Sequence, residues 1–364
     1  MKIAVGPVRT LVVDLFVAQG ALPAHAEIVA DHLIESSRMG LHSHGLIRVP
    51  QYFDAVASGE IDPKAMPIRE QLGAAMCQLD GQWGFGQVAA HVAADIACEL
   101  ALASGVSAVL ARHLAHVGRV GAYVQAIADR GLVSLAFCSG PKFGHWVAPF
   151  GGREGRMATN PIAYAFSTSG GPVVADFATS AATEGNLRYL RNQNKPAPDG
   201  YLRDASGAPT NDPSVIYVEP RGTIQPMGGE PQGHKGSALG ILVDVMASLL
   251  AGDDVTDASR RGNNLCLIAI APQGSFEHLA DNLAEYIRST PPLDPARPVM
   301  MPGDRENANL GAASSVVVDD VTWSQLAERA ERHRIAMPTI AATAEIGTNG
   351  QSTPITTPAV VCSS

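Results

Sequence analysis

Three side chains that could bind and react with a small acid lie within six positions of one another: Ser43, His44 and Arg48. A guanidinium pairs with a carboxylate in a forked geometry, and an imidazole can move a proton near neutral pH. The pattern predicts a helix that Ser43 caps, with His44 and Arg48, four residues apart, on one face. The stretch indicates a site for a small carboxylate, although an ordinary solvated helix start fits the same spacing.

A metal site is the other chemistry that this stretch could support, through His42 and His44. Two residues apart at a helix start, they point in different directions, which disfavours a shared metal ion. The cysteines are odd in number and scattered without CxxC spacing, which indicates reduced thiols and no structural zinc; they are Cys77, Cys98, Cys138, Cys266 and Cys362. We therefore expect no metal.

Two further segments could bind an anion. Residues 111–121 follow a predicted strand and open a predicted helix, so their backbone N–H groups could receive a phosphate, with His116 and Arg119 beside it. His234 and Lys235, flanked by glycines, precede an apolar helix predicted over 238–250. The alternative for His116 is a hydrogen-bonded structural histidine. The alternative for His234 and Lys235 is a glycine-flanked surface turn.

Two features could contact a nucleotide, but a structural role is the favoured interpretation of each. Gly84–Ala89 matches the dinucleotide pattern G-x-G-x-x-A between a strand and a helix. The next strand ends in Arg and His, whereas a ribose ligand would be acidic, so we favour a tightly packed turn. Asp176, at the end of a predicted strand, could be a ribose ligand, but we favour a helix cap.

Strands and helices must alternate to position these residues. Helices are predicted within 7–39 and from about residue 43, so the first 70 residues or so read as helical. From residue 74 strands near 75–79, 106–110 and 132–138 alternate with helices over 87–103 and 118–130, which indicates an α/β fold. Residues 195–213 read as an ordered loop, 299–306 as a turn, and the chain after Met337 as a loosely held tail.

The composition excludes several classes of function. The chain has 364 residues, enough for two domains or one large one, and a net charge of −9 without a dense basic run. Nucleic acid and anionic membrane surfaces are therefore unexpected partners. No secretion signal or membrane-spanning run is recognised, so we expect a cytoplasmic protein.

Six motifs in order over about 300 residues resemble one family, the type-2 malate/L-lactate dehydrogenases. Its relatives include ureidoglycolate and sulfolactate dehydrogenases and the Δ1-piperideine/Δ1-pyrroline-2-carboxylate reductases. The matching motifs are Gly40–Pro50, His116–Gly121, Gly151–Glu154 with Thr159–Pro161, Asp176–Ser180, Gly233–Gly236 and Pro302–Asp304.

The resemblance implies an NAD- or NADP-dependent oxidoreductase with a mixed, non-Rossmann α/β fold, acting on a small carboxylate substrate as a homodimer. It implies that Ser43 orients His44, that His44 or His116 exchanges the proton, and that Arg48 holds the substrate carboxylate, with Thr159 nearby. The implied cofactor residues are His116, Val117, Gly118, Arg119, Val120, Ser139, Asp176, Phe177, Ala178, Lys235, Gly303, Asp304 and Arg305.

The resemblance also implies a domain division. Residues 1–73 and 237–336 would form a helical, dimerising domain, 74–236 the NAD(P)-binding domain, and 337–364 a tail. The expected reaction interconverts a 2-hydroxy acid, such as malate or lactate, and its 2-oxo acid; reduction of a cyclic imino acid is the alternative. Glu184 departs from the family pattern, because several relatives have Arg there, and this disfavours the imino-acid alternative.

Overall fold

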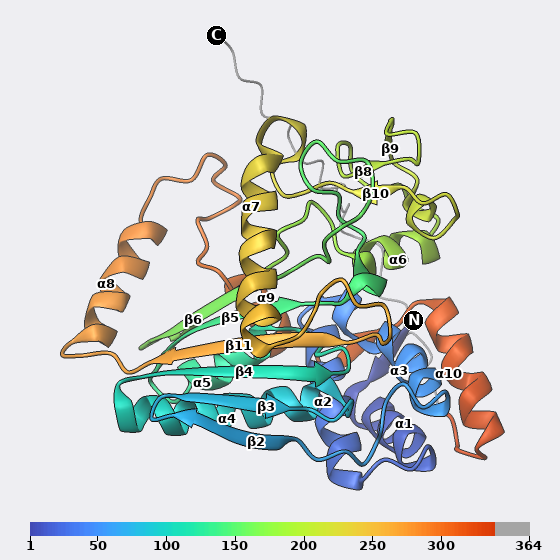
Figure 1. Ribbon diagram of the computed structural model, residues 1–364, viewed down its shortest axis with the longest axis horizontal. Coiled ribbons are helices and arrows are strands. Elements are labelled where there is room, and N and C mark those ends of the chain that lie inside the picture. The colour runs from blue at the N-terminus through green and yellow to red at the C-terminus, as the bar shows by residue number, and fades with distance from the viewer. Residues whose placement is uncertain (339–364) are drawn as a thin grey trace.

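A sheet of seven strands organises the part of the chain that the computed structural model describes, residues 1–338 (Figure 1). Its strands lie in the order β2-β3-β4-β11-β5-β6-β7. The bounds are Ile68–Gly73, Met76–Asp80, Val106–Leu114, Asn263–Ile270, Val133–Ser139, Ile162–Thr168 and Gly171–Phe177 in that order. Only β3 and β4 run parallel; the other neighbours in this sheet are antiparallel.

The central strands are apolar on both faces because both faces are covered. Side chains of a strand alternate between faces, and in β4 Val109 and Ala111 join the larger core while Leu110 points into the other. The larger core packs against α4 (Gly86–Ser104) and α5 (Gly121–Ala128). The alanines of α4 let this helix approach the sheet closely.

The opposite face of the sheet packs against α7 (Gly229–Ala247) through Val243 and Ala247. Helix α8 (Phe276–Arg288) lies over the β6–β7 edge of the sheet (Figure 1). Its Ala284 belongs to a small core that includes Val173 of β7. By length and composition 229–251 could also cross a bilayer; its packing on the sheet makes this weak evidence for a membrane span.

Helices from both ends of the chain gather at one end of the sheet (Figure 1). They are α1 (Val5–Ala18), α2 (Pro23–Arg38), α3 (Val49–Ala57) and α10 (Asp320–Arg332). A two-stranded pairing of β1 (Lys2–Ala4) with β12 (Ser315–Val317) joins the two ends of the chain. Their shared core buries Leu15, Leu33 and Leu326 completely.

A third part lies above that end of the sheet and consists of α6 (Glu184–Asn192) and a small sheet (Figure 1). The small sheet joins β8 (Leu202–Arg203) to β9 (Pro209–Thr210) and β10 (Thr223–Ile224). The remaining elements are α9 (Asp304–Ala312) and 3-10 turns at His42–His44, Leu46–Arg48, Lys142–Gly144, Pro213–Ile216 and Leu249–Ala251.

Most predicted elements are confirmed, but several need correction. The helix predicted over 118–130 spans only 121–128, and the turn predicted at 299–306 includes the start of α9. The loop predicted over 195–213 contains β8 and β9, which are too short to show periodicity. Residues 263–270 were assigned to the helical domain but lie in the middle of the sheet, because chain order does not reveal strand order. The predicted tail lies almost wholly outside the described residues.

Candidate active site

The Ser43–Arg48 segment is not the capped helix that the spacing predicts. Two 3-10 turns, His42–His44 and Leu46–Arg48, precede α3, and Gly45 separates them with an extended backbone. Gly45 is needed here because a Cβ would lie 2.1 Å from the Ser37 hydroxyl oxygen of α2. Ser43 therefore caps no helix, and its hydroxyl lies 2.9 Å from Nδ1 of His44.

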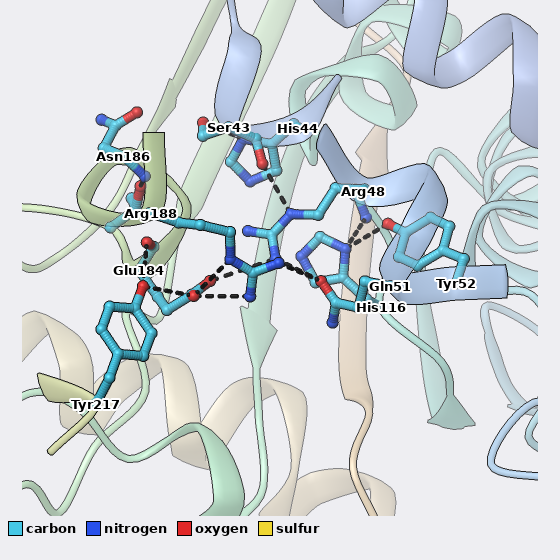
Figure 2. Close-up of polar contacts among 12 residues, drawn as sticks. Ser43, His44, Arg48, Gln51, Tyr52, His116, Glu184, Asn186, Arg188 and Tyr217 are labelled. Atoms are coloured by element: carbon cyan, nitrogen blue, oxygen red, sulfur yellow. Dashed lines mark hydrogen bonds and ion pairs between the residues drawn. The ribbon is translucent and has the colours of Figure 1, made fainter. Parts of the chain in front are cut away.

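The segment lies against the loop that carries His116. The imidazole rings of His44 and His116 are nearly parallel, with centroids 5.9 Å apart (Figure 2). Among the described residues neither Nε2 atom has a hydrogen-bond partner, and neither is enclosed by the protein. Two half-buried imidazoles thus present free nitrogens at one place, although they are 72 residues apart in the chain.

A hydrogen-bonded chain sets the tautomer of His116. The Gln87 amide donates to the Tyr52 hydroxyl at 3.0 Å, and that hydroxyl lies 2.6 Å from Nδ1 of His116. The Gly118 backbone N–H also points to Nδ1, at 3.3 Å. Because donors converge on Nδ1, it accepts, and the proton of the neutral ring lies on Nε2.

Two glycines hold the His116 loop close to its neighbours. A Cβ on Gly86 would lie 2.2 Å from the Ala115 carbonyl oxygen and 2.7 Å from that of His116. Gly118 has φ +75°, and a Cβ there would lie 2.3 Å from Nε2 of His32. Gly86, which belongs to the dinucleotide-like pattern, therefore serves close packing.

Arg48 is buried but has one free end. Its Nε donates to the Ser43 carbonyl at 2.8 Å, while Nη1 donates to Gln51 at 2.8 Å and to Glu184 at 3.3 Å. Within residues 1–338 Nη2 has no partner, and the protein does not enclose it. The forked pairing expected of Arg48 is wrong for this arrangement, since both Nη1 protons are taken; Nη2 remains for a ligand.

Glu184 is the centre of the polar cluster beside Arg48 (Figure 2). Besides Arg48, its carboxylate accepts hydrogen bonds from Arg188 at 2.7 Å and Tyr217 at 2.8 Å. Burial opposes ionisation, but Arg48 and Arg188 outweigh it and lower the pKa of Glu184 to about 2. The site thus holds a fixed carboxylate of its own, from the start of α6.

Both histidines are held neutral. Burial, helped by the charge of Arg48, lowers the pKa of His44 to about 3 and that of His116 well below its ordinary value. A neutral imidazole can accept a proton, and a bound carboxylate beside it would raise its pKa toward neutrality. The pair therefore suits proton exchange with a bound acid.

The cofactor residues expected around β7 lie together, although Asp176 is a cap. Its carboxylate accepts the Gly121 N–H at 2.7 Å, at the start of α5. The cap predicted for the helix that follows Asp176 is therefore wrong: the side chain of Thr183 caps α6. Val174 donates to the Pro302 carbonyl at 3.2 Å, which brings Gly303 beside the strand. The His116–Val120 loop, 176–178 and 303–305 therefore border one region of the protein.

The side chains in that region could hold a dinucleotide. Gly303 has φ +90° and starts α9, whose free N–H groups can receive a phosphate. Phe177 is 40% exposed and offers an apolar surface. Arg305 is exposed and pairs with Glu306, whereas Asp304 pairs with Arg288. Arg119 is buried, donates a hydrogen bond to Glu35 and adds positive charge to this region.

Three further expected residues have the following surroundings. Asn263 links Ser139 to the His116 loop, because its side chain donates to the Ser139 carbonyl and accepts from the Val117 N–H, each at 3.0 Å. Ser139 is buried and hydrogen-bonded to Ser248, and the Thr159 carbonyl accepts from Thr179 at 3.0 Å. Lys235 is exposed in the second turn of α7, which begins nine residues before the predicted start at 238. The anion site predicted at a helix start is therefore wrong for Lys235; Gly233 and Gly236 instead allow close packing on Phe150 and Met227.

The metal alternative finds no support in the geometry. His42 stacks on Tyr189 with centroids 4.9 Å apart, while His44 faces His116. Over residues 1–338 no three His, Cys, Asp or Glu side chains are grouped as metal ligands. Cys77, Cys98, Cys138 and Cys266 are free and buried.

Comparison with known proteins identifies the family. The profile of the malate/L-lactate dehydrogenases matches residues 3–327. The chain belongs to the malate/L-lactate dehydrogenase family. It is 34% identical to the L-lactate dehydrogenase of Cupriavidus necator over 93% of this chain and all of that one. It is 33% identical to the Δ1-pyrroline-2-carboxylate/Δ1-piperideine-2-carboxylate reductase of Pseudomonas syringae pv. tomato, covering 80% and 84%.

The fold agrees with this membership. The structure of sulfolactate dehydrogenase from Methanocaldococcus jannaschii matches with a TM-score of 0.81 and 26% identity, over 93% of this chain and 98% of that one. This family member is therefore an oxidoreductase with a mixed α/β fold, and family dehydrogenases use nicotinamide cofactors.

Sequence reasoning missed the residues that complete the cluster. Tyr52 and Gln51 follow Arg48 on α3, where helical spacing could have pointed to them. Gln87, Arg188 and Tyr217 come from distant elements, and nothing in the local sequence marks them.

Proposed function

We propose that the protein interconverts a small 2-hydroxy acid and its 2-oxo acid by hydride transfer with NAD or NADP. The observation that carries the proposal is the free Nη2 of buried Arg48 beside the two free imidazole nitrogens. A guanidinium can hold a carboxylate, and the neighbouring ring can exchange the hydroxyl proton. Positioning of this kind supplies about 7–11 kcal/mol in the best cases.

In oxidation, Arg48 Nη2 binds the substrate carboxylate and fixes the carbinol next to the histidines. His44, whose Nδ1 contacts Ser43, then accepts the hydroxyl proton at Nε2. The tautomer of His116 has a proton on Nε2 and would donate to the substrate oxygen, so we assign the base to His44 and the hydrogen-bond donor to His116. In reduction the imidazolium returns the proton.

The nicotinamide cofactor supplies the hydride acceptor when bound. We propose that its phosphates lie at the start of α9 near Gly303 and Arg305, and that Phe177 packs on an apolar part of it. We also propose that this site is not a Rossmann arrangement; the mostly antiparallel sheet supports that proposal. The choice between NAD and NADP is left to assay.

We propose that the protein is a homodimer. Ile241, Leu242 and Val245 expose apolar side chains along α7, and Leu249 and Leu250 continue that surface. Such a surface is usually an interface. Light scattering should give twice the chain mass, and a monomer at micromolar concentration would contradict this. The free, buried cysteines are compatible with a cytoplasmic location, which we also propose.

A panel of L-lactate, L-malate, sulfolactate and ureidoglycolate with NAD+ and NADP+ tests the activity at the nicotinamide absorbance. We expect turnover of at least one acid, and Arg48→Ala should raise its KM far more than that of the nucleotide. His44→Gln should remove the acidic limb of the pH profile of kcat, which reports the complex with bound acid, whereas His116→Gln should lower kcat without moving that limb. Absence of turnover in both directions on every acid would refute the proposal.

Cyclic imino-acid reduction is the second candidate, because reductases of this type are among the similar proteins. Oxidation of NADPH by Δ1-piperideine-2-carboxylate, compared with oxidation by pyruvate, distinguishes the two. A faster rate with the imino acid would replace the leading proposal.

A further inference from the structure

We propose that Glu184 makes the active site selective for acids with a single carboxylate. The inference rests on the proposed function, because it concerns the acid that Arg48 would bind. Glu184 and Arg188 are near neighbours on α6, and both face Arg48 and Gln51 (Figure 2). The cluster therefore has two fixed cations and one fixed anion, a net charge of +1.

The geometry places a bound acid close to this fixed anion. Glu184 occupies Nη1 of Arg48 at 3.3 Å, and Nη2 of the same guanidinium is the free donor. A ligand carboxylate on Nη2 would lie within roughly 7 Å of the Glu184 carboxylate, given ordinary hydrogen-bond lengths. One such ligand neutralises the cluster, whereas a dicarboxylate would leave an unpaired negative charge beside Glu184.

Glu184 is held rather than free to move away. Its side chain is only 13% exposed, and Tyr217 and Arg188 fix its Oε1 while Arg48 fixes Oε2. The guanidinium of Arg191 lies over the Tyr217 ring, 4.0 Å from its centroid. Arg191 is exposed, so solvent screens its charge. Glu35 and Arg119 pair with each other and add no net charge.

Calorimetric titration of the protein–nicotinamide complex with oxamate and tartronate tests this selectivity. Oxamate carries one carboxylate and tartronate two. Wild type should bind oxamate more tightly. Glu184→Gln keeps the size of the side chain and one accepting oxygen but removes the charge, so it should shift the ratio of the two Kd values toward tartronate on the order of tenfold. Arg188→Gln should weaken tartronate more than oxamate.

The double variant Glu184→Gln/Arg188→Gln separates charge from geometry, because it restores the net charge of +1 without the ion pair. A return toward the wild-type ratio supports the charge count. Any of three results would overturn the inference. They are tighter binding of tartronate than of oxamate by wild type, an equal gain in affinity for both acids in Glu184→Gln, and a changed Kd ratio that persists in the double variant. Selective binding of oxamate, without turnover in the panel of acids, would refute the proposed reaction alone. Turnover with a Kd ratio that does not favour oxamate would refute this inference alone. Binding of neither acid would refute both.

Discussion

Gly185→Ala is a small change that should disable Arg48 without unfolding the protein. Gly185 lies in the first turn of α6, and a Cβ there would lie 2.5 Å from Nη2 of Arg48 and 2.8 Å from Cβ of Ser43. Its backbone φ is not positive, so alanine itself should favour the helix by about 1 kcal/mol. Overpacking costs about 1–3 kcal/mol. We therefore expect the free energy of unfolding to change by no more than about 2 kcal/mol.

The activity should change much more, because the displaced atom is the one left free for the substrate. A hydrogen bond to a charged group contributes about 1.5–3 kcal/mol, which corresponds to roughly a 10- to 100-fold fall in kcat/KM for the acid. The fall should appear in the KM of the acid, with the KM of the nucleotide unchanged.

Steady-state kinetics on the preferred acid, with urea unfolding in parallel, measure both effects. Gly6→Ala in α1 is the matched control, because a Cβ there would meet nothing within 4 Å, and it should keep wild-type kinetics. A folded Gly185→Ala variant with wild-type kcat/KM would show that Nη2 of Arg48 does not bind the substrate.

Three further predictions follow from the site and the core. Tyr52→Phe removes the hydroxyl that fixes His116, so kcat should fall about 10-fold or more, and unchanged kcat would contradict the tautomer assigned above. Because burial lowers the pKa of His44 to about 3 in the unliganded protein, kcat/KM for oxidation should stay level from pH 8 to below pH 6; a decline centred at pH 6.5 would contradict the burial. Burial raises the pKa of Asp244 to about 6, so its ionised form destabilises the fold above that pH. In Asp244→Asn the amide oxygen can still accept from Asn160. By urea unfolding, this variant should stabilise the protein by up to about 3 kcal/mol at pH 8 and hardly at all at pH 4. Equal gains in stability at both pH values would refute this.

Local patterns predicted most helices and strands because each is encoded within a short window. Short, mostly apolar runs that alternate with predicted helices marked β3, β4 and β5, and the alanine-rich stretch marked α4. The sheet order was not predictable in this way. Strand β11 enters between β4 and β5 from more than a hundred residues downstream, and only its tertiary contacts determine that position.

The candidate site shows the same limit. Motifs identified Ser43, His44, Arg48 and His116, and the structure brings these residues together. The predicted helix start was wrong because Gly45, selected for close contact with Ser37, interrupts the turn. Glu184 was noticed only as a departure from the family, since its contact with Arg48 joins residues 136 positions apart.

A crystal structure of the protein with NADH or NADPH and oxamate tests the central claim most directly. We predict the oxamate carboxylate on Nη2 of Arg48 at about 2.7–3.2 Å, with its amide carbonyl oxygen within the same distance of Nε2 of His44 or His116. The nicotinamide ring should face the amide carbonyl carbon of oxamate, with the phosphates near Gly303. Oxamate bound away from Arg48, or a nicotinamide far from both histidines, would contradict the account.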